Sequence, residues 1–317
     1  MDLSVVISAY NEEESLPELF ERIASMATSA GLLYEMVVID DGSTDSTWKI
    51  IEGCAGKYPL KAISFRCNYG KSAALYCGFE AAEGDVIVTI DADLQDGPEE
   101  IPEMIRMVNN EGFDLVSGWK KKRYDSKLTK NLPSKIYNAT ARWVTGIKLH
   151  DMNCGLKAFR RDVIKNIEVY GEMHRYIPYL SKNAGFSNIG EKVVRHYPRK
   201  YGKSKFGASR FINGFLDLLS LWFLSKFGKR PMHFFGLFGT FTFLIGLCTA
   251  LYLIIEKLYT QSHGLHFRAV TDQPLFYISL VALIIGMQLF LAGFVAELVS
   301  RNSADRNRYR IGKRIGI

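Results

Sequence analysis

The chain has few cysteines, and they follow no pattern that would serve a metal site or a disulfide framework. The five residues are odd in number and scattered along the chain: Cys54, Cys67, Cys77, Cys154 and Cys248. This distribution excludes a cysteine-ligated metal cluster and indicates reduced thiols in a cytosolic compartment. The N-terminus, MDLSVVISAY, also lacks a basic segment before its first apolar run, so we do not expect a secretory signal. Internal repeats and low-complexity tracts are missing as well.

Two segments near the C-terminus contain no Asp, Glu, Lys or Arg, namely 231–255 and 273–296. Each is long enough to cross a hydrocarbon core of about 30 Å as a helix that rises about 1.5 Å per residue. A buried core helix is the alternative, but two uninterrupted runs of this length so close together favour membrane spans. We predict transmembrane helices at 231–256 and 275–299, joined by a non-cytoplasmic loop at 257–274.

The net charge of +7 is concentrated beside these two runs. Basic residues gather in 199–230 and again in 301–314, whereas the loop between the runs holds only Lys257 and Arg268. This asymmetry predicts that the N-terminal domain and a basic tail at 300–317 both lie in the cytoplasm, at a bacterial inner membrane. Attraction to anionic lipid head groups explains the charge better than a nucleic acid partner, which we do not expect.

Residues 206–230 mix aromatic residues and leucines with flanking Lys and Arg. This pattern predicts an amphipathic helix that lies in the membrane interface, and an ordinary surface helix is the alternative.

The first 120 residues alternate short apolar runs with stretches of helical spacing. The runs LSVVISAY, YEMVVIDD, KAISFRCN, DVIVTIDADL and FDLVSGW are typical of buried strands. Helical spacing follows at 12–27, 44–57, 71–83 and 98–111. Such alternation predicts an α/β fold with a mostly parallel sheet flanked by helices, which we assign to residues 1–205. In sheets of this kind ligands bind outside the carboxyl ends of the strands.

The strongest chemical signal is the sequence Asp91-Ala92-Asp93-Leu94-Gln95-Asp96 after the strand DVIVTI. Alternation along a strand would point Asp91 and Asp93 the same way. Two carboxylates together at a strand end are suited to Mg²⁺ or Mn²⁺, which would neutralise the charge of a departing nucleotide diphosphate. Solvated turn aspartates are the alternative.

Two other strand ends carry polar groups suited to a nucleotide. Asp40 and Asp41 follow YEMVVI, and a carboxylate there can accept hydrogen bonds from a base or a ribose hydroxyl. Tyr10 and Glu12 follow the first strand, where Tyr10 could stack on a base. Glu12 alone is weak evidence, because an acidic residue in a first helical turn also favours the helix dipole.

Four motifs in order resemble those of family 2 glycosyltransferases, which are inverting enzymes of the GT-A fold. They are Ala9-Tyr10-Asn11-Glu12, Val38-Ile39-Asp40-Asp41-Gly42-Ser43, Asn68-Tyr69-Gly70-Lys71 and Asp91-Ala92-Asp93-Leu94-Gln95-Asp96. With the two C-terminal spans, the chain is most similar to the polyprenyl-phosphate glycosyltransferases, a group that includes dolichyl-phosphate mannose synthase and bacterial undecaprenyl-phosphate glucosyltransferases. The resemblance implies metal binding by Asp91, Asp93 and Gln95. It implies nucleotide-sugar contacts from Ala9, Tyr10, Glu12, Asp40, Asp41, Lys71, Asp91 and Ala92, with Asp93 also counted as catalytic.

The segment 150–160, HDMNCGLKAFR, resembles the acceptor segment of the same family. Asp151 is the candidate for positioning or deprotonating the acceptor. Lys157 stands where the family has arginine, which keeps the charge but loses bidentate geometry toward a phosphate, and Arg160 is expected to compensate.

A phosphate acceptor needs cations more than it needs a base. A phosphate monoester has a second pKa of about 6, so it is largely dianionic at neutral pH. Candidate contacts to it are Lys157, Arg160, Arg175, Arg199, Lys203 and Lys205. The basic stretch 196–205 resembles the family's flexible loop before the membrane helices, while binding of lipid head groups is the alternative.

We therefore expect a metal-dependent hexosyltransferase that uses a nucleotide diphosphate sugar, weakly favoured as UDP-glucose-like, and a polyprenyl phosphate in a lipid bilayer. A transferase to a lipid hydroxyl or a polysaccharide is one alternative, and a non-catalytic membrane scaffold that binds nucleotide sugars is another. The sequence leaves a homo-oligomer open.

Overall fold

The computed structural model describes residues 1–121, 132–201, 223, 231–264, 269–302, 309 and 311–316. These residues form two compact units, a sheet-containing unit and a helical unit. The interfacial helix expected at 206–230 lies outside the described residues except for Phe223.

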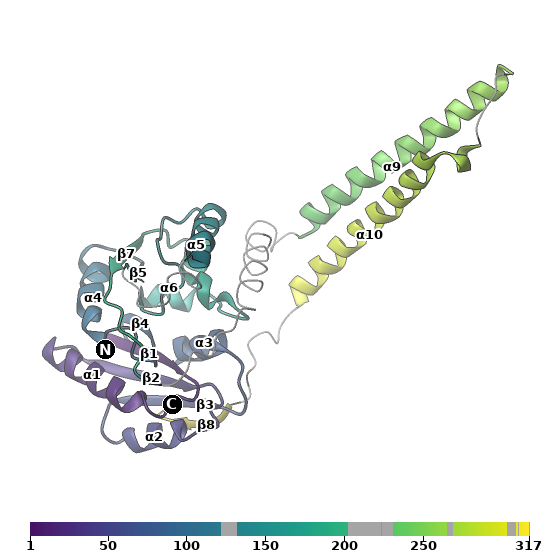
Figure 1. The fold of residues 1–317 in the computed structure, drawn as a ribbon. Helices are drawn as coiled ribbons and strands as arrows, with labels where there is room; N and C mark the ends of the chain where they lie inside the picture. Colours follow the sequence, from purple (N-terminus) through teal and green to yellow (C-terminus); the bar gives the residue numbers. More distant parts are fainter. Residues whose placement is uncertain are drawn as a thin grey trace. The chain divides into compact units, whose positions relative to one another are not determined.

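The sheet-containing unit is built on eight strands in the order β7-β5-β6-β4-β1-β2-β3-β8 (Figure 1). Six strands run in one direction, and β6 and β8 run against their neighbours. The expected mostly parallel α/β sheet is therefore confirmed. The strands are β1 (Leu3–Ala9), β2 (Tyr34–Asp40), β3 (Leu60–Phe65), β4 (Val86–Asp91), β5 (Leu115–Trp119), β6 (Lys157–Arg160), β7 (Ile189–Val193) and β8 (Ile311–Ile315).

Helices cover both faces of this sheet because neighbouring strand residues point to opposite sides. In β1, Val5 and Ile7 join a core with α1, α2 and α4, whereas Val6 joins a second core with α3, α6 and α7. The helices are α1 (Leu16–Ser29), α2 (Thr47–Cys54), α3 (Lys71–Ala81), α4 (Ile101–Asn110), α5 (Leu132–Thr145), α6 (Arg161–Lys165) and α7 (Ile177–Asn183), with 3₁₀ turns η1 (Pro98–Glu100) and η3 (Met173–Tyr176).

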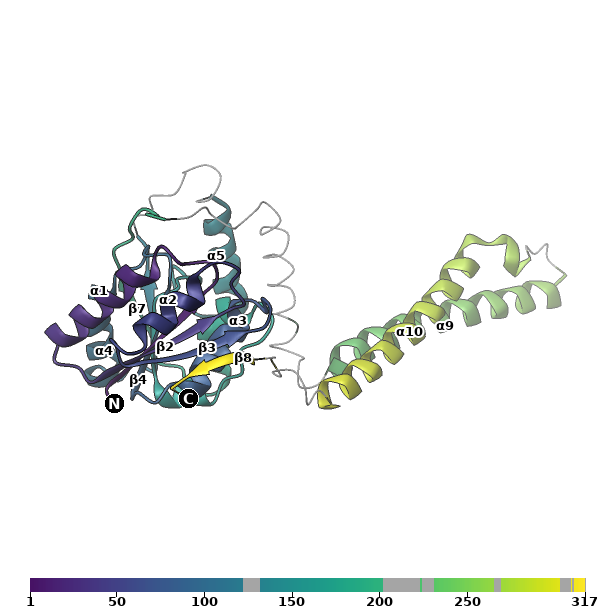
Figure 2. The same cartoon turned by 90° about the horizontal axis from the view of Figure 1, so that it is seen from below.

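The C-terminus differs from the expectation of a separate basic tail. Ile311–Ile315 forms β8, which pairs antiparallel with β3 at the edge of the sheet (Figure 2). The sequence IGKRI is short and two of its five residues are charged, so its basic residues hid its strand character. The sheet-containing unit thus takes residues from both ends of the chain, before and after the helical unit.

The helical unit consists of α9 (Pro231–Ser262) and α10 (Pro274–Asn302), with the turn η4 (Val270–Asp272) between them. Both helices are long and apolar enough to cross a membrane, with mean hydropathies of 2.1 and 2.4, and only 17% of each apolar stretch is buried. That low burial argues against the alternative of soluble core helices.

Glycines allow the backbones of α9 and α10 to approach closely. A Cβ atom added at Gly246 would lie 2.7 Å from the carbonyl oxygen of Ser279, and one at Gly286 would lie 2.6 Å from the nitrogen of Phe243. Small residues at helix contacts are typical of helix pairs in membranes, where close packing drives association.

Candidate active site

Three parallel strands end together and bring their polar residues to one edge of the sheet. In the register, Ser8 of β1 lies opposite Asp91 of β4, and Ala9 lies opposite Asp40 of β2. The backbone N–H of Asp41 donates to the carbonyl oxygen of Ala9 at 2.8 Å. Motifs that are about 30 and 50 residues apart in the sequence therefore lie at one edge, which we call the carboxyl edge.

Asp91 and Asp93 interact there, but not for the reason given by strand alternation. Strand β4 ends at Asp91, and Asp93 lies in the turn that follows, where Leu94 has a φ of +58°. A leucine in this left-handed region is strained, and such strain is typical of functional sites. Burial, and next the charge of Asp91, raise the pKa of Asp93 to about 6, so the two like charges act on each other.

Each of these carboxylates is paired with a cation from another segment. The Lys71 ammonium, at the start of α3, contacts Asp91 Oδ1. Burial alone would raise the pKa of Asp91, but Lys71, and after it Lys120 and Lys157, lower it to about 2. An Arg199 guanidinium nitrogen lies 2.6 Å from Asp93 Oδ2 and donates to Gln95 Oε1 at 3.3 Å.

The backbone of Gly155 forms one wall beside Asp91. A Cβ atom at this position would lie 2.3 Å from Asp91 Oδ2, so any side chain here would displace the carboxylate. The Thr89 hydroxyl donates to the Gly155 carbonyl at 2.8 Å and fixes this approach. The close approach of this backbone to Asp91 therefore requires a glycine at position 155.

Asp91, Asp93 and Gln95 fit a divalent cation that shares its coordination with substrate. They supply two carboxylates and an amide oxygen, which are hard ligands of the type that Mg²⁺ and Mn²⁺ prefer. Across the described part of the chain, no group of three or more His, Cys, Asp or Glu side chains could hold a metal ion. The fit is therefore to an ion completed by substrate phosphates, and not to a site made by protein ligands alone.

Local hydrogen bonds hold Asp40, the last residue of β2, and Asp41, which follows it. Asp40 accepts hydrogen bonds from the Ser43 N–H at 3.0 Å and the Ser64 hydroxyl at 2.9 Å. Asp41 accepts from the backbone N–H groups of Tyr69 at 2.7 Å and Gly70 at 2.9 Å. Burial raises the pKa of Asp41 to about 6 despite these two donors. Asp41 thus ties the loop before Lys71 to the sheet.

Tyr10 and Glu12 lie where the sequence places them, just beyond the end of β1. The backbone N–H of Glu12 donates to the Thr47 hydroxyl at 2.9 Å, and the Glu12 carboxylate accepts from the Ser15 hydroxyl at 2.9 Å. These bonds tie the segment after β1 to the start of α2.

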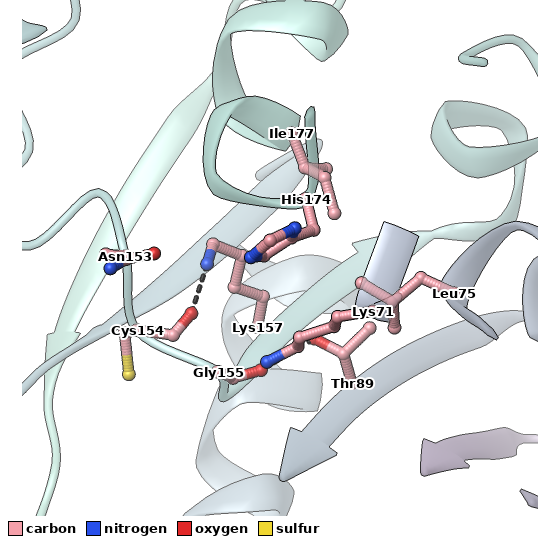
Figure 3. A pocket seen from close by; sticks show the side chains of 9 residues that line it. All are labelled: Lys71, Leu75, Thr89, Asn153, Cys154, Gly155, Lys157, His174 and Ile177. Atoms are coloured by element: carbon pink, nitrogen blue, oxygen red, sulfur yellow. Dashed lines mark hydrogen bonds between the residues drawn. The ribbon is translucent and has the colours of Figure 1, made fainter. Parts of the chain in front are cut away.

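A small polar cavity opens beside Lys71 and Lys157 (Figure 3). Lys157 is 3% exposed, and its ammonium group donates to the carbonyl oxygen of Cys154. Burial lowers the pKa of His174 well below its usual value, and the nearby Lys71 charge adds to this effect, so His174 is neutral. The lining residues are Lys71, Leu75, Thr89, Asn153, Cys154, Gly155, Lys157, His174 and Ile177.

The acceptor-side candidates separate into two groups. Lys157 pairs in the sheet with Thr89, near the carboxyl end of β4, whereas Arg160 pairs with Val86 at its amino end. The structure does not bring Arg160 to the carboxyl edge, because β6 runs antiparallel to β4. Arg160 instead forms an ion pair with Asp114 at 3.1 Å.

Asp151 and Arg175 are buried near the cavity. The Asp151 carboxylate accepts from the Asn153 N–H at 3.2 Å, and Arg175 lies next to His174 and 3.3 Å from the Glu172 carboxylate. Lys203 and Lys205, predicted to contact the acceptor phosphate, lie outside the described residues.

Two groups that were not among the predicted site residues also shape the site. Lys120 forms an ion pair at 2.7 Å with the buried Asp96, the last residue of the DADLQD motif. His174 lines the cavity, and its Nδ1 atom shares a hydrogen bond of 3.1 Å with the Ser72 hydroxyl. Lys120 belongs to a basic run that could equally have been a solvated surface, and His174 lies in an irregular segment next to the predicted Arg175, so the sequence did not single out either residue within its segment.

The segment 4–168 matches the glycosyl transferase family 2 domain. The chain is 35% identical over 304 residues to dodecaprenyl-phosphate galacturonate synthase of Rhizobium johnstonii, covering 95% of this chain and 88% of that protein. It is 36% identical over 315 residues to undecaprenyl-phosphate 4-deoxy-4-formamido-L-arabinose transferase of Shewanella sediminis, covering 98% and 91%.

Among solved structures, the fold is similar to that of glucosyl-3-phosphoglycerate synthase of Mycobacterium tuberculosis in complex with Mn²⁺, UDP-glucose and glycerol 3-phosphate. The TM-score is 0.53, the identity is 23%, and 69% of this chain and 80% of that chain are covered. This likeness concerns the fold and agrees with the GT-A architecture expected from the motifs. The chain belongs to glycosyl transferase family 2, within which its relatives are polyprenyl-phosphate glycosyltransferases.

Proposed function

We propose that this protein transfers a hexose or related sugar from a nucleotide diphosphate sugar to a polyprenyl phosphate, with inversion at the anomeric carbon. The observation that carries the proposal is the pair Asp91 and Asp93 at the carboxyl edge, each held by a long cation from another segment. The two relatives whose names specify dodecaprenyl-phosphate and undecaprenyl-phosphate support the acceptor class.

The donor binds across the carboxyl edge. Ala9, Tyr10, Glu12, Asp40 and Asp41 surround the nucleoside, and Ala92 lies beside the diphosphate. A divalent metal, Mg²⁺ or Mn²⁺, bound by Asp91, Asp93 and Gln95 would neutralise the charge that develops on the leaving nucleotide. Lys71 and Arg199, which pair with these carboxylates in the structure, would then be available to contact substrate phosphates.

The acceptor phosphate is held by cations and needs little help from a base. Lys157 reaches it from β6, Arg199 from the segment before the membrane helices, and Arg175 supports the same wall. Asp151 orients the phosphate, which is already ionised at neutral pH. The cavity lined by Lys71, Lys157 and neutral His174 has room for about one water molecule, so the donor sugar is proposed to lie outside it, along the carboxyl edge.

The nucleotide is proposed to be uridine diphosphate, and the glucose-like sugar expected from the sequence stays a proposal. The relatives named for galacturonate and 4-deoxy-4-formamido-L-arabinose make these two sugars equal candidates. A homo-oligomer is compatible with this function and is not required by it.

The proposed location is the cytoplasmic face of a bacterial inner membrane, with α9 and α10 as the spans. Because β8 joins the same sheet as β1 to β7, the chain must return to the side from which it entered the helical unit. An even number of crossings agrees with this return, and the distribution of basic residues favours the cytoplasm as that side.

The test is a transfer assay with the full chain in lipid nanodiscs. Labelled UDP-glucose, UDP-galacturonate, UDP-4-deoxy-4-formamido-L-arabinose and GDP-mannose are each supplied with undecaprenyl phosphate and Mn²⁺ or Mg²⁺. We expect one donor to give a lipid-linked sugar phosphate that resists mild base but is released by mild acid. Absence of lipid-linked product with all donors and both metals contradicts the proposal, and product only with free dolichol or a polysaccharide primer favours the hydroxyl-acceptor alternative.

A further inference from the structure

The C-terminal strand reaches the nucleotide side of the site through one aromatic residue. Tyr309 lies two residues before β8, and its ring centroid is 5.7 Å from that of Phe65, 5.4 Å from that of Tyr69 and 6.1 Å from that of Tyr76. Phe65 ends β3, Tyr69 is in the following loop, and Tyr76 is on α3. One residue from beyond the helical unit therefore contacts three consecutive segments of the sheet-containing unit.

The loop that Tyr309 contacts is the loop that Asp41 holds. Tyr69 and Gly70 donate their backbone N–H groups to the two oxygens of Asp41. Gly70 has a φ of +91°, a conformation that glycine adopts without the energetic cost that other residues would pay. The next residue, Lys71, carries the ammonium that pairs with Asp91.

These contacts form a continuous path from the C-terminal strand through Asp41 to Asp91. Pairing of β8 with β3 fixes the strand, and the ring of Tyr309 packs on Tyr69. Tyr69 and Gly70 then present their amides to Asp41, and α3 begins with Lys71 directed at Asp91. Aromatic pairs of this geometry each contribute beyond their buried area.

We propose that Tyr309 is a positioning residue of the nucleotide-sugar site, which the chain completes only after it has passed through α9 and α10. The residue touches no substrate. It fixes the 66–71 loop so that Asp41 and Lys71 are preorganised, and it makes the strand after the helical unit part of the catalytic machinery. This inference rests on the proposed function for its kinetic consequence, but its structural consequence is measurable without substrate.

The first experiment measures hydrogen exchange in the 66–71 segment of the full-length protein without substrate. Tyr309→Ala is expected to speed exchange of the Tyr69 and Gly70 amides about tenfold, and Tyr309→Phe, which keeps the ring, is expected to match the wild type. Lys313→Ala is the matched control on β8, because Lys313 is 61% exposed and lies 3.6 Å from Glu52. Unchanged exchange at 66–71 in Tyr309→Ala overturns the proposal.

Tyr309→Ala could also release β8 altogether, which would speed exchange across 60–65. Tyr309→Leu keeps apolar volume without the ring and addresses that case. In the leucine variant, faster exchange at 66–71 with unchanged exchange at 60–65 supports the ring contact. Faster exchange at both segments in this variant overturns it.

The second experiment measures steady-state kinetics with the donor identified in the transfer assay. We expect the KM for donor to rise about tenfold in Tyr309→Ala, the KM for undecaprenyl phosphate to stay within twofold, and the phenylalanine variant to restore both. Equal rises in both KM values would indicate general damage and contradict the inference. If the wild type makes no product while exchange at 66–71 responds as expected, the proposed function fails and the positioning role of Tyr309 stands.

Discussion

The carboxyl edge of the sheet and the opposite edge, where β1, β2 and β4 begin and which we call the amino edge, both carry ion pairs that are at least partly buried, but they use them differently. At the amino edge, Glu35 is 2% exposed, and it accepts from the Ser4 hydroxyl at 2.5 Å and the Glu83 N–H at 2.8 Å and lies 3.0 Å from Lys61. At the carboxyl edge, Asp91 and Asp93 meet Lys71 and Arg199, and the turn after β4 holds Leu94 at a strained φ of +58°.

This comparison teaches that a buried charge by itself does not mark a site. Groups from adjacent strand ends surround Glu35 and close the sheet. The acidic pair at the carboxyl edge is instead a concentration of like charge, held by flexible side chains that a ligand can displace. The amino edge should therefore control stability, and the carboxyl edge should control activity.

The largest effect is expected at the acidic pair. Asp93→Ala should lower the rate of lipid-linked product formation roughly 10³-fold, because metal stabilisation of a leaving group supplies several kcal/mol. The melting temperature should not fall, since the change removes a repulsive like charge from Asp91. The transfer assay and thermal unfolding measure the two quantities in the same preparation.

Asp162→Ala is the matched control, because this carboxylate is 72% exposed and 3.7 Å from Arg160 at the opposite edge. It should leave the rate unchanged. Product within tenfold of the wild type in Asp93→Ala would break the distinction between the edges, because Asp93 would then not carry the activity.

The amino edge provides the reciprocal case. Glu35→Ala should lower the free energy of unfolding of the sheet-containing unit by about 3 kcal/mol, because it leaves buried donors without their acceptor. The KM for donor in the folded protein should not change. Urea denaturation followed by tryptophan fluorescence measures the loss. Glu83→Ala, at a side chain 63% exposed, should lower the free energy of unfolding by much less than Glu35→Ala does. Equal losses in the two variants would argue against a structural role specific to Glu35.

Asp151 tests the chemistry of the acceptor. With a phosphate acceptor, Asp151→Asn should reduce kcat by no more than about tenfold, because the nucleophile is ionised without a base. With a hydroxyl acceptor, loss of a general base would cost roughly 10²–10⁴-fold. The measurement is kcat with saturating undecaprenyl phosphate, and a loss beyond 10² would favour the hydroxyl-acceptor alternative.

The smallest effect is expected at Arg160. Arg160→Ala should change the KM for undecaprenyl phosphate by less than twofold, because the residue is paired with Asp114 at the amino edge. Lys157→Ala, three residues away on the same strand, should raise that KM about tenfold, since it removes a cation that we propose contacts the acceptor phosphate. Steady-state titration of the lipid at fixed donor compares the two, and a larger effect at Arg160 would reverse our assignment of the edges.

Much of this arrangement could be predicted from the sequence, for identifiable reasons. The alternation of β-branched runs with helical spacing predicted the parallel strands β1 to β5, and the parallel direction then placed Ala9, Asp40 and Asp91 at one edge. Two charge-free runs predicted α9 and α10. These signals are local, so they survive without knowledge of tertiary contacts.

The remaining features depend on strand direction and on contacts between distant segments. Arg160 was expected near the acceptor because it is close to Lys157 in sequence, but the antiparallel direction of β6 separates them across the sheet. The return of Ile311–Ile315 to β3 could not be inferred either, because a strand at the edge of a sheet needs little apolar sequence of its own. Asp91 and Asp93 lie near each other because of the turn after β4, and not because of alternation along a strand.

The most direct test of the account is a structure of the full chain with Mn²⁺ and UDP, recorded with anomalous scattering at the manganese edge. We predict a single anomalous peak bounded by Asp91, Asp93 and Gln95, with Lys71 and Arg199 moved from the carboxylates to the diphosphate. UDP bound at this edge with both ion pairs unchanged and no manganese between the two carboxylates would contradict the central claim.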